Sequence, residues 1–176
     1  YPQDIGVLAP FFLQLMHLQP GQAAYLPPGR LHAYLRGLGL EIMANSDNVL
    51  RAGLTPKHVD IEGLLEILDF GYPGLQVLDA LPREECGFSY PVLTDEFALS
   101  GFELGTGFSQ TVQSSTGIQI LLCTQGVLEV CAEYNGKCEV VKSGQSVCIP
   151  ACVQKWWISG RGKAFVASTG LEAGRV

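Results

Sequence analysis

Apolar residues in the second half of the chain come in short runs separated by glycine and polar residues. Such runs predict β-strands, because a strand needs only a few residues to cross a small domain. Many short strands in succession are typical of a barrel or a sandwich. We expect strands at 97–103, 109–114, 118–123, 127–133, 137–142, 145–149, 155–158 and 163–167.

The first half of the chain has fewer strand-like runs and one helix. Apolar runs at 11–18, 22–26 and 38–43 predict three further strands. Apolar residues recur at helical spacing from Ile61 to Leu68, which predicts a helix over 60–69 that begins with Asp60 as its N-cap. A stretch rich in proline and glycine, 71–92, is the best candidate for a linker. The chain therefore divides into two predicted lobes, 1–92 and 93–176.

A short pattern occurs once in each half. Residues 21–27 read GQAAYLP and residues 144–150 read GQSVCIP, so both have the form G-Q-x4-P around an apolar run. The pattern predicts two related β-lobes, although short repeats of this kind also arise by chance. The second copy lacks the glycine and histidine that follow the first.

Composition limits the classes of partner and compartment. The 176 residues are 47% hydrophobic and 16% charged, with a net charge of −6. This acidic balance disfavours nucleic acid and anionic membranes as partners, and no run of about 18 apolar residues predicts a membrane span. Six cysteines without a C-x-x-C pair are expected to be reduced and mostly buried, which favours a cytoplasmic setting. Because the chain starts at Tyr1, we expect it to be the C-terminal part of a longer protein.

Residues 21–32 read GQAAYLPPGRLH and resemble the second motif of the cupin superfamily, G-x5-P-x-G-x2-H. A glycine opens a turn, a strand follows, and the Pro-Pro-Gly sequence makes a second turn. His32 is then expected to face the interior of a small β-barrel. Neutral imidazole is a common metal ligand, so the motif predicts a metal site.

The next 26 residues, HAYLRGLGLEIMANSDNVLRAGLTPK from His32 to Lys57, resemble the long second signature of type I mannose-6-phosphate isomerases. The resemblance implies an all-β fold of cupin-like, jelly-roll lobes. It also implies one zinc ion, with His32 as one of four protein ligands and the other three in an earlier part of the enzyme. That N-terminal part is thus an expected partner. The resemblance places a catalytic arginine at Arg51 and sets the other site residues around a sugar-phosphate pocket: Tyr34, Glu41, Asp47 and Lys57.

These residue types suit an aldose–ketose isomerisation. A proton leaves the carbon beside a carbonyl, an enediol forms, and the proton returns one carbon away. A cation such as Arg51 stabilises the developing oxyanion, and a carboxylate such as Glu41 or Asp47 can move the proton. A phosphate is bound by arginine or lysine, here Lys57, and Tyr34 either lines the pocket or packs in the barrel.

Plainer roles remain open for each residue. Arg51 could simply pair with Asp47, and Lys57 could be a solvated surface lysine. Glu41 could support a neighbouring site residue instead of moving the proton. The rival function is a non-catalytic cupin that binds or senses a sugar phosphate. Because one imidazole cannot hold zinc alone, these 176 residues by themselves are expected to bind zinc poorly and to be inactive.

Overall fold

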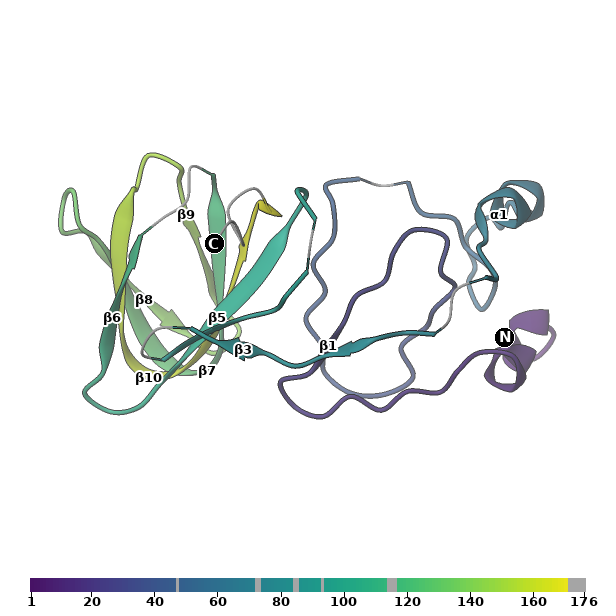
Figure 1. Cartoon of the computed structure of the whole chain (residues 1–176), viewed down its shortest axis with the longest axis horizontal. Coiled ribbons are helices and arrows are strands. Elements are labelled where there is room, and N and C mark those ends of the chain that lie inside the picture. Colours follow the sequence, from purple (N-terminus) through teal and green to yellow (C-terminus); the bar gives the residue numbers. More distant parts are fainter. Residues whose placement is uncertain (47, 72–73, 84–85, 93, 114–116, 171–176) are drawn as a thin grey trace. The chain divides into compact units, whose positions relative to one another are not determined.

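The computed structural model describes residues 1–46, 48–71, 74–83, 86–92, 94–113 and 117–170 (Figure 1). The chain forms two compact units. The first contains residues 1–41 and 45–78, and the second contains residues 42–44 and 79–176. The boundary after Leu78 falls inside the predicted linker, in which the described residues include three short strands. The division into two related lobes at residue 92 stays a prediction.

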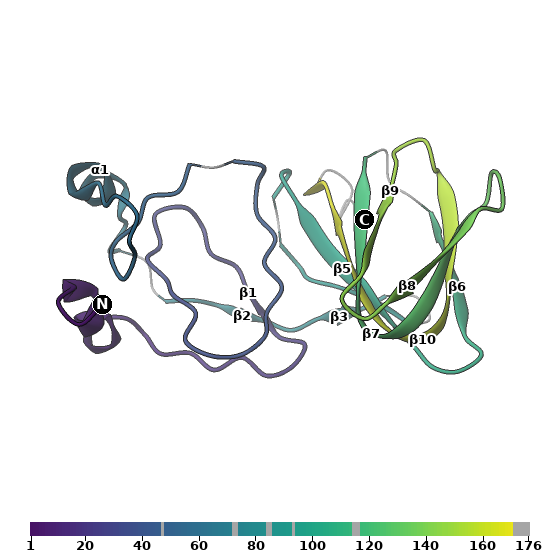
Figure 2. The same ribbon diagram turned by 180° about the vertical axis from the view of Figure 1, so that it is seen from behind.

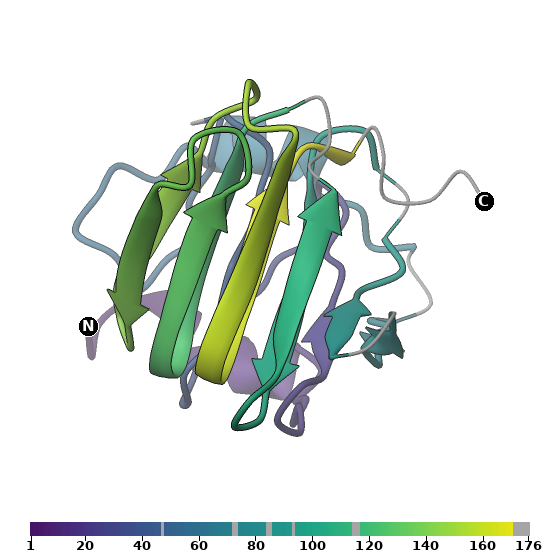
Figure 3. The same cartoon turned by 90° about the vertical axis from the view of Figure 1, so that its left-hand side faces the viewer.

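The second unit is an antiparallel β-structure (Figure 3). Its main sheet has the strand order β3-β4-β5-β10-β7-β8, with β6 paired to β10 and β9 paired to β7. The strands are β3 (Leu81–Pro82), β4 (Gly87–Ser89), β5 (Ala98–Leu104), β6 (Ser109–Gln113), β7 (Gln119–Ala132), β8 (Cys138–Lys142), β9 (Ser146–Ile149) and β10 (Lys155–Ser168).

Two long strands organise this unit, because each of them has different neighbours along its two halves. The start of β10 pairs with β6 and its end pairs with β5, while β7 pairs along its whole length with β10. The start of β7 also pairs with β9 and its end pairs with β8. The sequence predicted two strands within each of these segments. That prediction was wrong, because each segment continues past its glycines as one strand. The two strands stay paired on both sides of the glycines, with one register shift at Lys163/Ala164.

Alternating residues on one face of these strands form the core. Trp156 is fully buried, donates its indole N–H to Gln119 Oε1 at 3.0 Å, and meets the ring of Phe102 edge-on at 6.0 Å between centroids. Burial of one face and exposure of the other is the pattern expected of antiparallel sheets. The core cluster further includes Leu104, Leu121, Cys123, Leu128, Val130, Val141, Ile149, Ile158 and Val166.

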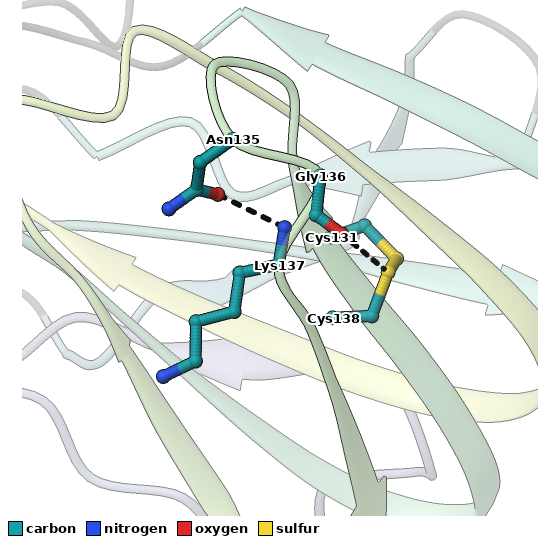
Figure 4. The surroundings of a disulfide bond; sticks show 5 residues. All are labelled: Cys131, Asn135, Gly136, Lys137 and Cys138. Carbon is teal, nitrogen blue, oxygen red and sulfur yellow. Dashed lines mark hydrogen bonds between the residues drawn. A yellow bond between two sulfur atoms is a disulfide. The ribbon is translucent and has the colours of Figure 1, made fainter.

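The cysteines differ from the expectation of reduced, buried thiols. Cys131 at the end of β7 and Cys138 at the start of β8 are directly opposite and form a disulfide (Figure 4). The hairpin loop between them is also held by Asn135 Oδ1, which accepts the Lys137 N–H at 2.9 Å. Among the four free cysteines, Cys123 is buried, Cys86 is half-buried, and those at 148 and 152 are exposed. The expectation failed because spacing alone does not show which cysteines a hairpin brings face to face.

The first unit has little regular structure (Figure 2). It contains the 3₁₀ helix η1 (Ile5–Phe11), a two-stranded sheet of β1 (Ala23–Ala24) and β2 (Val77–Leu78), and the helix α1 (Ile61–Ile67). The predicted helix is confirmed, with Asp60 as the N-cap accepting the Gly63 N–H at 3.0 Å.

The strand predictions in this unit were less successful. The run 22–26 contains only the two residues of β1, and the predicted strands at 11–18 and 38–43 are wrong. A strand needs a partner for its backbone hydrogen bonds, and the described residues of these two runs pair with no other strand. Their side chains are also uncovered, with Phe11 at 82% and Leu38 at 99% exposure.

The two units differ in burial. Every buried hydrophobic side chain of the described residues lies at or beyond Tyr90, so the first unit contributes none of them. In the described part of the chain, no helix is long and apolar enough to cross a membrane.

Candidate functional site

The turn that precedes His32 is anchored to the end of helix α1. The Gly29 carbonyl accepts the Asp69 N–H at 3.1 Å, and the Arg30 guanidinium donates to both the backbone carbonyl and the carboxylate of Asp69. Gly29 has φ +77°, and a Cβ there would lie 2.5 Å from the Ile67 carbonyl oxygen, so only glycine fits. A hydrogen bond from the Gly71 N–H, together with the charge of Arg30, lowers the pKa of Asp69.

This anchored turn orients the imidazole of His32. Its Nδ1 lies 2.8 Å from the backbone carbonyl oxygen of Arg30. Because a carbonyl can only accept, Nδ1 must carry the hydrogen, and in the neutral imidazole the lone pair then lies on Nε2. A backbone carbonyl on the second ring nitrogen is the usual support of a metal-binding histidine. His32 is exposed in this chain, so its Nε2 is open to further ligands.

Tyr34 lies beside this imidazole and connects it to Glu41. The ring of Tyr34 meets that of His32 edge-on, at 6.0 Å between centroids and 65° between planes. The Tyr34 hydroxyl donates to Glu41 Oε1 at 3.1 Å. Partial burial, with smaller effects from the bond to Glu41 and its charge, raises the pKa of Tyr34. The hydroxyl therefore stays a donor at neutral pH. Glu41 is exposed and lies in an irregular segment, not on the predicted strand.

Of the other predicted site residues, the two that the structure describes, Arg51 and Lys57, are not joined to this trio. Within the ranges that the structure describes, Arg51 is exposed and no hydrogen bond or ion pair connects its side chain to another residue. Lys57 lies in a turn in which its backbone N–H donates to Thr55 Oγ1 at 3.1 Å, and its side chain is exposed. Asp47 lies outside the described residues, so the Arg51–Asp47 pair stays a prediction.

The repeated G-Q-x4-P pattern corresponds to the same local turn in both units. Gly21 and Gly144 have φ +89° and +82°. The side-chain Oε1 of the following glutamine accepts the backbone N–H three residues earlier in each copy, at 2.9 Å for Gln22 and 3.0 Å for Gln145. The backbone N–H of each glutamine also donates to the carbonyl of that same earlier residue. The sequence echo is therefore a shared turn that leads into a short strand.

Two residues that support the site were not identified from the sequence. Arg30 is one of two variable positions between Gly29 and His32 in the motif, and Asp69 is the last residue of the predicted helix. The signal for the pair was present but weak, because opposite charges 39 residues apart become informative only once the turn and the helix are known to meet.

Comparisons with known proteins agree with the fold and with the motif. No protein-family model matches the chain. The mannose-6-phosphate isomerase of Escherichia coli (strain K12) is 36% identical over 165 residues, which cover 93% of this chain and 41% of that protein. The probable mannose-6-phosphate isomerase of Caenorhabditis elegans is 56% identical over 70 residues, 40% of this chain and 17% of its own.

Solved structures give the same result. A crystal structure of a point mutant of phosphomannose isomerase from Salmonella typhimurium superposes with a TM-score of 0.84 at 33% identity, and covers 96% of this chain and 42% of that one. This similarity confirms the predicted all-β, cupin-like fold. The chain spans about two fifths of the length of the Escherichia coli and Salmonella typhimurium proteins.

Proposed function

We propose that this chain, a homologue of the C-terminal portion of mannose-6-phosphate isomerases, forms part of a zinc-dependent enzyme that interconverts mannose 6-phosphate and fructose 6-phosphate. One observation carries the proposal. His32, at the start of the segment that resembles the family signature, has its Nδ1 bonded to the Arg30 carbonyl and its Nε2 open. This is the arrangement expected of a histidine that binds a metal.

The donor chemistry of His32 fits a zinc ion. A neutral imidazole with a lone pair on Nε2 is a preferred zinc ligand, and the turn anchored on Asp69 restricts its movement. When bound, zinc would polarise the carbonyl of the sugar or orient its oxygens. Three further ligands are needed, and we propose that they belong to an N-terminal part of the same enzyme.

The exposed apolar side chains of the first unit support the presence of such an N-terminal part. Its described side chains include none of the buried hydrophobic residues, while large apolar side chains such as Phe11, Leu15 and Leu38 are largely exposed. A unit without a core is not stable alone. Because the relatives are more than twice as long as the matched segment, a further part of the enzyme is the natural cover for these side chains.

The roles of the other residues follow from the reaction. Isomerisation moves one proton between adjacent carbons and shifts a double bond, so it needs no external oxidant or reductant. We propose that Glu41 takes and returns the proton, and that the Tyr34 hydroxyl holds its carboxylate in place and contributes to substrate binding. The Arg51 guanidinium stabilises the enediolate oxygen and Lys57 binds the phosphate. Asp47 is proposed to assist catalysis beside Arg51. A cytoplasmic location belongs to the same proposal; the four free thiols favour it, whereas the Cys131–Cys138 disulfide argues against it.

The proposal is tested by assaying the complete enzyme with mannose 6-phosphate and with zinc. Arg51→Ala should lower kcat by about 100-fold or more, as expected for loss of a charge that stabilises the transition state, while substrate binding is retained. Arg161→Ala, which removes an exposed arginine of the second unit, is the matched control and should leave kcat unchanged.

The metal is tested separately. His32→Ala should weaken zinc binding by more than about 100-fold, since loss of an outer partner alone typically costs 10- to 100-fold. His58→Ala, another exposed histidine, should not change it. A wild-type enzyme that binds sugar phosphate without turnover would overturn the isomerase proposal in favour of the non-catalytic cupin.

A further inference from the structure

Asp4 connects the beginning of the chain to the turn that follows Arg51. Its Oδ1 accepts the Gly6 N–H at 2.7 Å as the N-cap of η1. Its Oδ2 accepts the Leu54 N–H at 2.8 Å, across 50 residues of sequence. One half-buried carboxylate therefore holds two backbone segments together through both of its oxygens.

The two segments are packed without space between them. A Cβ on Gly53 would lie 2.8 Å from Asp4 Oδ1 and 3.5 Å from the Cα of Gly6. A Cβ on Gly6 would lie 2.9 Å from the Leu54 side chain. A side chain at either position would push the segments apart, so both positions beside Asp4 need glycine.

The turn itself is in an unfavourable conformation. Leu54 has φ +54°, and it is the one non-glycine residue with positive φ in the described part of the chain. A branched side chain in this region persists only when surrounding contacts hold it there, and such residues concentrate at functional sites. The contact to the Leu54 backbone that can do so is the bond to Asp4, strengthened by the charge of the carboxylate.

We propose that Asp4 is a positioning residue for Arg51. The inference rests on the proposed isomerase function, in which the Arg51 guanidinium meets the enediolate. The Arg51 side chain extends from the backbone that leads into this turn, three residues before Leu54, so a shift of the turn would move the guanidinium. Asp4 fixes that turn by accepting the Leu54 N–H, and does so without contacting substrate.

The test uses the complete enzyme and the conversion of mannose 6-phosphate. Asp4→Ala should lower kcat by about 100-fold with KM changed by less than about threefold, because a displacement near 1 Å of a catalytic group can cost that much. In the Asp4→Ala background, Leu54→Gly should raise kcat by at least about tenfold, since glycine adopts a positive φ without help from the carboxylate. Asp60→Ala, which removes an equivalent N-cap bond at α1, is the matched control and should leave kcat within about twofold.

A double-mutant cycle separates positioning from general support. In an Arg51→Ala background, Asp4→Ala should lower kcat by less than about threefold, because the residue through which it acts is gone. An equal loss in both backgrounds, or a kcat for Asp4→Ala near that of the wild type, would overturn the inference while leaving the isomerase proposal intact. An inactive wild type would overturn both. If Asp4→Ala does not fold, Asp4→Asn, which keeps one acceptor oxygen, gives the same cycle with a smaller expected loss.

Discussion

Leu121 gives the most direct test of the core of the second unit. It lies on the inner face of β7 with 0% exposure, whereas its neighbour Ile120 lies on the outer face with 50% exposure. Truncation of a fully buried leucine to alanine removes about 2–2.5 kcal/mol of transfer free energy, and the cavity raises the total to about 3–4 kcal/mol. For a unit of this size, each kcal/mol lowers Tm by about 4–8 °C, so Leu121→Ala should lower Tm by at least about 12 °C.

The assay follows tryptophan fluorescence during urea and thermal unfolding. Both tryptophans, Trp156 and Trp157, lie on β10, so the signal reports on the second unit alone. Ile120→Ala removes a similar side chain from the exposed face and should cost about 1 kcal/mol or less. Equal losses of stability for Leu121→Ala and Ile120→Ala would show that the assignment of inner and outer faces is wrong.

Three further predictions concern the disulfide and the site. Denatured but unreduced protein should show four titratable thiols, rising to six after reduction, and Cys138→Ser should lower the free energy of unfolding by about 2 kcal/mol in the fluorescence assay, from loop-closure entropy. The raised pKa of Tyr34 means that its hydrogen bond is complete below the ordinary tyrosine range and is lost only as pH rises through the raised value. The ultraviolet difference titration between wild type and Tyr34→Phe should therefore show ionisation at higher pH than for a free tyrosine, and a midpoint at or below the ordinary value would contradict this. Arg30→Lys should weaken zinc binding by the complete enzyme roughly tenfold, because lysine lacks the planar fork through which the two guanidinium nitrogens of Arg30 each bond one group of Asp69. Arg161→Lys should have no effect on a zinc titration.

The sequence predicts the second unit well because its signals are local. Alternation along β5, β8 and β9 and the turns between them fix where strands occur, and Asp60 marks the start of α1. The predicted breaks in β7 and β10 were wrong for a tertiary reason. Gly126 pairs with Gly162 across the two strands, so neighbouring backbone compensates for the flexibility of each glycine.

The first unit is less predictable because its contacts are not local. The run 11–18 has strand-like composition, but among the described residues it finds no neighbour with which to pair. The family resemblance named His32 and Glu41. However, it gave neither the tautomer of His32, which depends on the Arg30 carbonyl, nor the connection of Asp4 to Leu54. Such contacts depend on where distant segments meet, which periodicity does not encode.

The glutamine-closed turns have a kinetic consequence. Every bond that defines the turn at Gln145 spans three residues, so it can form on the microsecond scale of a hairpin, before strands far apart in sequence find one another. The pairing of β10 with β5 joins residues about sixty positions apart and must come later. Folding of the β-rich unit is therefore expected to start from the hairpin of β7 and β8 and the turn that leads into β9, and to finish when β10 pairs with β5.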